Sequence, residues 1–152
     1  MCKTDFMMAE WLSSKDRFNG FGTVTFKQAR SVDDGFLIYN SRENVEATCA
    51  VIRDRVFKHF KRKFTWVTAI EDGHGDKRIH AHMAIAIPDD IAFDEFQSVY
   101  LDMCGRMDWV YDVYDIRQIT DQDGDSGSRK VIFYMTKEGA DALALNASTW
   151  IG

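Results

Sequence analysis

The sequence predicts an α+β fold, in which helices pack on a largely antiparallel sheet. Strand patterns and helix patterns alternate along the chain without a repeat or a linker. The two strongest strand patterns, FTWVTAIE (64–71) and RIHAHMAIAI (78–87), are separated by a short turn-forming segment and most simply pair as an antiparallel hairpin. A length of 152 residues fits one domain, spanning 1–152, with a core of its own.

The first half of the chain contains two further candidate strands and one helix. FGTVTF (21–26) has strand composition, and GFLIY (35–39) is a candidate second strand. Asn40 or Ser41 can cap a helix that runs to about Lys61. Apolar residues recur there at three- and four-residue steps and predict one buried face: Val45, Cys49, Ile52, Val56 and Phe60.

The second half continues with helix, strand, loop and helix. Pro88 ends the strand 78–87, and a helix is expected from about Ile91 to Arg106. Its buried stripe is predicted to be Phe93, Phe96, Tyr100 and Met103. Residues 108–119 have strand composition, 121–128 form a loop, and the last helix is expected over about 130–145.

Composition excludes several classes of protein. With 45% hydrophobic and 13% aromatic residues, the chain is globular and not disordered. No apolar run reaches the length of a membrane span, and the N-terminus lacks a secretory signal pattern. Three scattered cysteines indicate neither a disulfide framework nor a zinc knuckle. These features predict a cytoplasmic protein without a membrane partner.

The charges are segregated along the chain. The net charge of −5 alone argues against nucleic-acid binding. However, residues 53–63 hold six Arg or Lys against one acid, whereas residues 89–125 hold eleven Asp or Glu. The basic segment predicts a phosphate-binding flank, with a solvated helix face as the equal alternative. Its candidate DNA-binding residues are Lys58, Lys61, Arg62 and Lys63.

The predicted hairpin places metal-ligating side chains on one face. His80 and His82 are two residues apart on a strand, so both point to the same side, followed only by small residues that leave room for a ligand. If the faces that carry the smaller side chains lie on the same side in both strands, Glu71 lies across from the two histidines. It then completes a set of two imidazoles and one carboxylate. Packed or solvated histidines are the alternative. Asp72 is a rival ligand, and His74 in the turn is interpreted as a surface residue.

A second pair of reactive side chains follows in VIFYMTKEGAD (131–141). Tyr134 and Lys137 are three residues apart and would share a face of a helix. A phenol can attack phosphorus while an ammonium and a metal stabilise charge on the phosphate oxygens. The pair alone is weak evidence, but it becomes informative beside the His–Glu set.

In order along the chain, FGTVTF, Glu71 with HAHM, and YMTKE resemble the three motifs of the HUH endonucleases. The resemblance is greatest to the single-tyrosine replication initiators (Rep proteins) of rolling-circle plasmids and small single-stranded DNA viruses. It covers about residues 21–141. It implies a ferredoxin-like, RRM-like domain whose central antiparallel sheet carries the histidines.

The resemblance also implies roles for individual residues. Glu71, His80 and His82 would bind Mg²⁺ or Mn²⁺, and Tyr134 would attack single-stranded DNA to leave a 3′-hydroxyl and a 5′-phosphotyrosine link. Lys137 would help to place the metal or the phosphate. The substrate would be a replication origin, as a single strand or a hairpin. Because the chain has no P-loop, a host helicase would unwind the DNA. The candidate DNA-binding residues are Thr23, Thr25 and Arg78, besides Lys58, Lys61, Arg62 and Lys63.

Two alternatives stay open at this stage. A single-tyrosine insertion-sequence transposase of the same superfamily is also short, and in that family a polar residue four after the tyrosine joins the metal site; here Glu138 occupies that position. The other alternative is a non-enzymatic RRM-like module that binds nucleic acid by stacking bases on aromatic side chains. It gives the His–Glu set no purpose.

Overall fold

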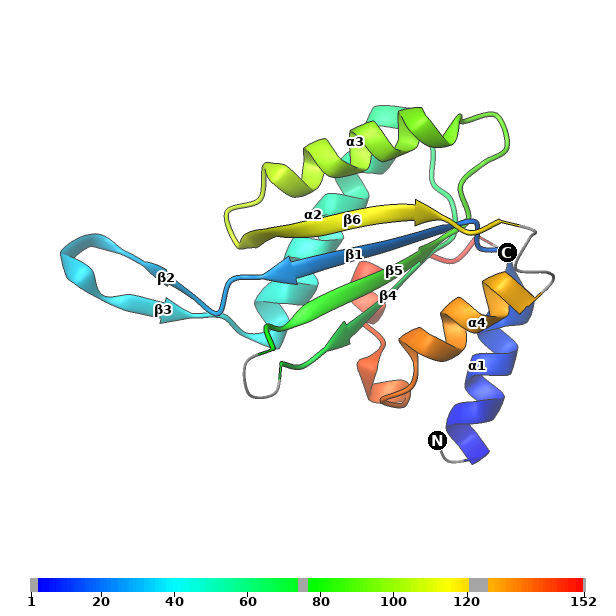
Figure 1. Cartoon of the computed structure of the whole chain (residues 1–152), viewed down its shortest axis with the longest axis horizontal. Coiled ribbons are helices and arrows are strands. Elements are labelled where there is room, and N and C mark those ends of the chain that lie inside the picture. Colours follow the sequence, from blue (N-terminus) through cyan, green and yellow to red (C-terminus); the bar gives the residue numbers. More distant parts are fainter. Residues whose placement is uncertain (1–2, 74–76, 121–125, 152) are drawn as a thin grey trace.

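A computed structural model describes residues 3–73, 77–120 and 126–151 and has one four-stranded antiparallel sheet between two layers of helices (Figure 1). The sheet order is β4-β5-β1-β6, and its strands are β1 (Gly20–Phe26), β4 (Trp66–Glu71), β5 (His80–Ile85) and β6 (Val110–Gln118). Helices connect β1 to β4 and β5 to β6, which is the βαββαβ order of a ferredoxin-like fold. The predicted α+β class and the antiparallel hairpin are confirmed.

One face of the sheet is covered by two helices, α2 (Arg42–Phe60) and α3 (Phe93–Gly105). Helix α2 begins as predicted, because the Ser41 hydroxyl accepts the backbone N–H of Asn44, and it ends at Lys61, whose φ is 58°. Between sheet and helices lies the larger core, in which Trp66, Met83 and Tyr100 are fully buried. We call this the closed face.

The opposite face is covered over only part of its area, by α1 (Lys3–Lys15) and α4 (Ser126–Met135). The small side chains of this face, Val67, Ala69 and Ala84, are buried beneath these two helices. The expectation that the small residues after the histidines leave room for a ligand is therefore wrong at Ala84, because helices fill that room. The open part is the end of the face that carries the histidines, and we call it the open end.

The C-terminal region differs from the predicted helix 130–145. Helix α4 starts earlier, at Ser126, and ends at Met135; Gly139 then adopts φ 95°, which favours glycine. Two short 3-10 helices follow, η3 (Ala140–Ala142) and η4 (Leu145–Ala147). Main-chain bonds tie this segment to β4: Ala144 donates to Thr68, and Trp66 and Thr149 donate to each other. The predicted loop 121–128 thus ends in the first turn of α4, while 121–125, like the turn residue His74, lie outside the described residues.

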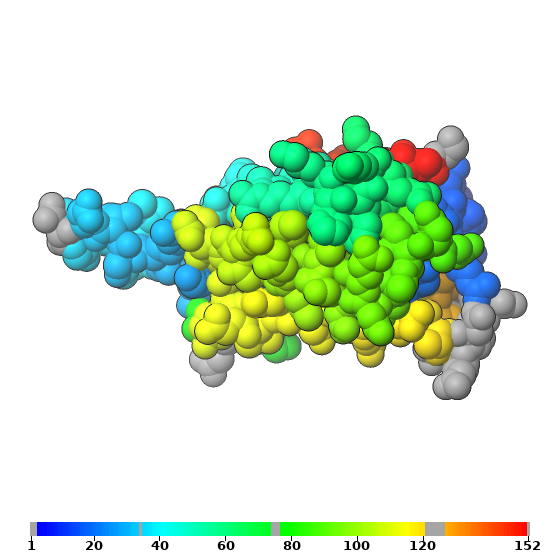
Figure 2. Space-filling model, turned by 90° about the horizontal axis from the view of Figure 1, so that it is seen from above, coloured from blue at the N-terminus to red at the C-terminus, as the bar shows by residue number. Residues whose placement is uncertain are grey.

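A two-stranded hairpin projects from the body between β1 and α2. Its strands are β2 (Ala29–Ser31) and β3 (Leu37–Tyr39), joined by the 3-10 turn η1 (Asp33–Gly35). We call residues 27–40 the arm; the space-filling view shows it standing clear of the rest of the molecule (Figure 2). The predicted strand 35–39 is confirmed over Leu37–Tyr39, but it pairs with β2 and does not join the main sheet.

Candidate metal centre and nucleophile

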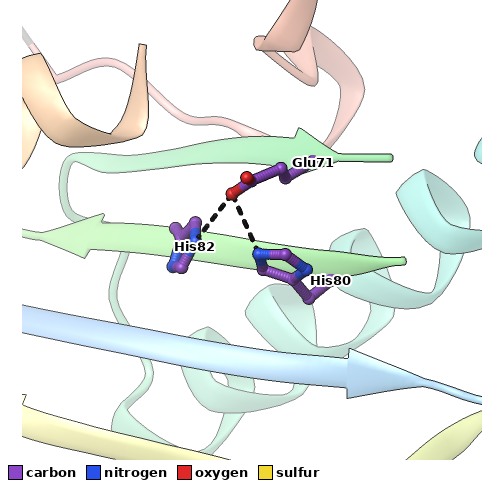
Figure 3. A group of neighbouring side chains, drawn as sticks. All are labelled: Glu71, His80 and His82. Atoms are coloured by element: carbon purple, nitrogen blue, oxygen red, sulfur yellow. Dashed lines mark hydrogen bonds and ion pairs between the residues drawn. The ribbon is translucent and has the colours of Figure 1, made fainter. Parts of the chain in front are cut away.

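The register of the β4–β5 hairpin brings the three predicted ligands together. Glu71 is the partner of His80 and Ala69 is the partner of His82, so all three side chains project from the same face. Glu71 Oε2 lies 2.9 Å from Nε2 of His80 and 3.4 Å from Nε2 of His82 (Figure 3). The ligand atoms of the group all lie within 4.8 Å of one another. The predicted convergence of Glu71, His80 and His82 is what the structure has.

The other ring nitrogen of each histidine is held by a hydrogen-bond partner. Nδ1 of His80 is 3.0 Å from the carbonyl oxygen of Arg78. A carbonyl only accepts, so Nδ1 is the donor. Nδ1 of His82 lies 3.3 Å from the hydroxyl of Thr23 on the neighbouring strand β1. Held this way, both histidines turn Nε2 toward the Glu71 carboxylate, an orientation typical of metal-ligating histidines with outer hydrogen bonds.

His82 is buried, and its Nε2 makes no hydrogen bond with any residue of the described structure. The 3.4 Å contact with Glu71 is an ionic approach without hydrogen-bond geometry. Burial, together with the neighbouring His80, lowers the pKa of His82 to about 4. His82 is therefore neutral at pH 7, and its Nε2 faces the carboxylate. A buried nitrogen without a partner is costly, and a cation would satisfy it.

The three donor atoms fit a divalent metal ion. Ligand atoms bound to one ion at about 2.1 Å lie about 3 Å apart, which matches the 2.9 and 3.4 Å separations. Two imidazoles and one carboxylate leave coordination positions open for substrate oxygen or water. Asp72 and Glu138 do not belong to the converging group. Glu138 instead lines a cavity of about 290 Å³ beside Glu71, together with Asp72 and Asp141.

Lys137 supplies a positive charge next to the ligand set. Its Nζ lies 3.3 Å from Oε1 of Glu71 and 4.3 Å from the ring centroid of Tyr134. Burial of Glu71 alone would raise its pKa, but His80 and Lys137 outweigh that effect and hold the pKa below its usual value. Partial burial likewise opposes the charge of Lys137, whereas Glu71 and Tyr134 raise its pKa overall. The pair is thus ionised at neutral pH.

Tyr134 lies over the histidines at the C-terminal end of α4. Its ring is 5.3 Å from the ring of His82, and 48% of the residue surface is exposed. Lys137 does not share a helical turn with it as predicted, because α4 ends at Met135. The two stay adjacent since the turn after the helix brings the backbone N–H of Lys137 within 3.4 Å of the Tyr134 carbonyl. An exposed phenol, an ammonium and the ligand set therefore face one space.

Strand β1 supports the site from the other side. Thr23 pairs with His82 and Thr25 pairs with His80, so both predicted residues flank the ligand set. Phe21 is a residue that the sequence analysis missed: its ring stacks on His82 at 5.4 Å and meets Tyr134 edge-on at 6.1 Å. The sequence could have indicated Phe21, because residues 21, 23 and 25 of a strand point to the same face, so Phe21 shares the face of Thr23 and Thr25.

The candidate DNA-binding cations fall at two ends of the sheet. Arg78 lies at the open end, where its guanidinium covers the ring of Tyr111 at 4.0 Å. The basic cluster that includes Lys58 and Lys63 lies before the start of β4. Glu71 is the last residue of that strand, at its other end. Six residues of strand span about 20 Å, so the structure does not bring the cluster to the metal centre. Within that cluster, Arg62 is paired with Asp90 at 2.7 Å.

Comparison with models of protein families, with curated proteins and with solved structures gives no match to the chain. None of the helices in the described ranges is long and apolar enough to cross a membrane.

Proposed function

We propose that the protein is a metal-dependent endonuclease and strand transferase that acts on single-stranded DNA through Tyr134. The observation that carries the proposal is the placement of the exposed Tyr134 ring 5.3 Å from the His82 ring, beside Lys137 and above the Glu71–His80–His82 group. Mg²⁺ or Mn²⁺ held by these three ligands would polarise the phosphate to be attacked.

The covalent step is a phosphoryl transfer to the phenol. The oxygen of Tyr134 forms a bond to phosphorus, and the bond from phosphorus to the 3′-oxygen breaks. The phenolic proton is lost to solvent and the leaving oxygen takes up a proton, which gives a free 3′-hydroxyl and a 5′-phosphotyrosine. Attack by another 3′-hydroxyl reverses the step and joins strands. Lys137 lies beside the phenol ring, where its positive charge can stabilise negative charge that develops during the transfer.

The roles of the surrounding residues follow from their contacts. Thr23 holds the ring of His82 through Nδ1, and the main chain of Arg78 holds the ring of His80. Lys137 can neutralise charge on the phosphate oxygens because its Nζ lies between Glu71 and Tyr134.

The biological setting we propose is initiation of rolling-circle replication at a single-stranded or hairpin origin, in the cytoplasm of a cell that carries a mobile element. We propose a host helicase as the partner that unwinds the DNA. The alternative of an insertion-sequence transposase is less favoured, because Glu138 lies outside the converging ligand set that its role would require. The non-enzymatic RRM-like module is less favoured because it leaves the buried Nε2 of His82 without a purpose.

The test is covalent capture of DNA by the protein. The wild-type protein is incubated with single-stranded oligonucleotides from its own replicon, in Mn²⁺ or in EDTA, and separated on a denaturing gel. We expect a metal-dependent covalent adduct that is absent in Tyr134→Phe, while that variant still binds the oligonucleotide.

Tyr111→Phe is the matched control, since Tyr111 is an exposed tyrosine at the same end of the sheet. It should form the adduct normally. Absence of any adduct, with Mn²⁺ binding demonstrated by calorimetry, would contradict the nuclease and favour a binding module. An adduct that persists in Tyr134→Phe would contradict the assignment of the nucleophile.

A further inference from the structure

The arm carries the most exposed aromatic side chains of the described structure. Phe36 is 70% exposed and Tyr39 is 73% exposed, on a hairpin that stands clear of the body (Figure 2). Neighbouring aliphatic residues are also exposed, Leu37 at 53% and Ile38 at 49%. Exposed apolar groups of this size on a projecting element indicate a binding surface.

The arm starts at the open end of the sheet. Thr25 is paired with His80, and the arm leaves β1 two residues later, at Lys27. Figure 1 shows it extending beyond the end at which β4 stops and β5 begins. A strand of DNA that crosses the metal centre toward this end would therefore reach the arm.

The base of the arm is fixed to the body by hydrogen bonds. The backbone N–H of Asn40 donates to Gln28 at 2.8 Å, and its side-chain amide donates to the carbonyl of Lys27 at 2.9 Å. Asn40 Oδ1 in turn accepts from the Asn44 side chain in the first turn of α2. These bonds hold both strands of the arm at its root, so a partner would meet a preorganised element.

Cations and aromatic rings alternate between the metal centre and the arm. Arg78, just before β5, covers Tyr111 of β6, so the pair bridges the intervening strand β1. Arg30 in the arm lies 5.3 Å from the ring of Trp109 and 3.6 Å from the exposed Asp108, a pair that contributes little in water. Guanidinium groups beside aromatic rings provide both phosphate contacts and stacking planes for nucleic acid.

The distribution of side chains on the arm fits nucleic acid better than a protein partner. Strand alternation puts Tyr39 with Leu37 on one side and Phe36 with Ile38 on the other. The apolar surface is thus divided between two narrow sides, each with one ring, and does not form the single broad face that a second protein would cover. A ring on each side can stack a base.

We propose that the arm binds the single-stranded DNA that flanks the cleaved phosphate, with bases stacked on Phe36 and Tyr39 and phosphates held by Lys27, Arg30 and Arg78. This inference rests on the proposed function, which brings the strand to the open end. It adds a second contact region, distinct from the metal centre, that lengthens the bound segment without taking part in the chemistry.

The experiment measures binding of single-stranded oligonucleotides from about 4 to about 16 nucleotides by fluorescence anisotropy. It uses the Tyr134→Phe background, so that cleavage does not interfere. We expect affinity to rise with length until the arm is reached. Phe36→Ala and Tyr39→Ala should each lower the affinity for the longer oligonucleotides about 10-fold and leave the shortest ones unaffected.

The double variant Leu37→Ala/Ile38→Ala is the matched control, because it removes apolar side chains from the same hairpin without removing a ring. It should bind DNA like the parent. An equal loss of affinity in the control, or wild-type affinity in both aromatic variants, would overturn the proposal. A dimer in sedimentation analysis that the aromatic variants dissociate, with DNA affinity unchanged, would overturn it in favour of a second copy of the chain.

Failure of the arm proposal is distinguishable from failure of the nuclease proposal. Arm variants made with Tyr134 intact should still form the adduct with a short oligonucleotide. If the adduct forms and the arm variants bind DNA like the parent, only the arm proposal is contradicted. Length-dependent binding through the arm without any adduct would sink only the nuclease.

Discussion

The two faces of the sheet treat buried polar groups differently. On the closed face, the polar side chains sit among apolar neighbours in their neutral form. Burial raises the pKa of Cys104 to about 12 and that of Cys49 still further, while Tyr100 contacts the sulfur of Met83. Among the described residues, the closed face also buries one nitrogen without a partner, Trp66 Nε1. At the open end, by contrast, the buried nitrogen without a partner is His82 Nε2, which lies beside an ionised carboxylate and an ammonium.

The difference indicates which face was shaped by stability and which by chemistry. Burying a polar atom without a partner costs about 1–3 kcal/mol, and of the two such nitrogens in the described ranges only His82 Nε2 lies beside a carboxylate, where a cation could satisfy it. Met83 and His82 are adjacent on β5 and both are buried, yet Met83 packs in the larger core and His82 turns Nε2 toward Glu71. The open end thus has an arrangement that is suited to holding a cation.

The largest expected effect concerns the cysteines of the closed face. Both Cys49 and Cys104 are buried, and at pH 8 their raised pKa values leave almost no thiolate. In a Cys2→Ser background we expect modification by a disulfide reagent to be slowed at least about a thousandfold relative to the unfolded chain. Native and guanidinium-unfolded protein are compared by absorbance. Rapid reaction of either thiol in the native protein would show that the closed face opens.

Replacing two sequence neighbours that face opposite sides of the sheet, one at a time, should separate the effect on stability from the effect on metal binding. His82→Ala should weaken Mn²⁺ binding at least about 100-fold, because it removes one of the three proposed ligands. Met83→Ala should lower the free energy of unfolding by about 2–5 kcal/mol and leave Mn²⁺ affinity nearly unchanged. Calorimetric titration and urea unfolding measure the two quantities. Equal Mn²⁺ affinity in His82→Ala and wild type would remove the metal assignment.

A smaller effect is expected from the residue that orients His82. Thr23→Val removes the hydroxyl that lies 3.3 Å from Nδ1, and we expect about 10-fold weaker Mn²⁺ binding. Thr23→Ser should restore the wild-type affinity. Thr25→Val is the control, since Thr25 shares the same face but forms no hydrogen bond to a histidine in the described part of the chain. A loss in Thr25→Val as large as in Thr23→Val would argue for a general effect on packing.

The smallest effect is expected at the end of the sheet farthest from the metal centre. Replacement of Lys58, Lys61 and Lys63 by Ala should weaken binding only of longer oligonucleotides, and lower the salt slope by about 0.7 for each lost phosphate contact. The comparison variant Lys3→Ala/Lys15→Ala on α1 should leave the slope unchanged. If the salt dependence of DNA affinity is also unchanged in the triple variant, the DNA does not bind at this end of the sheet.

The sequence predicted those features that depend on local periodicity. Alternation with a period of two fixed the faces of β4 and β5, and with them the convergence of Glu71 and the two histidines. Ser41 predicted the start of α2, because a capping side chain accepts a hydrogen bond from backbone only a few residues away in the sequence.

Features that depend on distant partners were not predictable. Helix α1 went unpredicted because only Ala9 and Leu12 are buried in it, which leaves little apolar period to detect. The expected helix 130–145 stops early because the edge of β4 offers the chain main-chain partners that local sequence does not show. The basic cluster was visible as a cluster, but its distance from the metal centre depends on the length of β4.

The C-terminal segment that lies along β4 has a consequence for self-association. Bridges from Leu143 to Ala69 and from Thr149 to Trp66 occupy this margin of the sheet, so another chain cannot readily add a strand there. The opposite margin, β6, carries exposed Asp112, Asp115 and Arg117, which discourage sheet extension through charge. Shortening the chain at its C-terminal segment would expose the unpaired backbone of β4, so truncation is expected to promote aggregation.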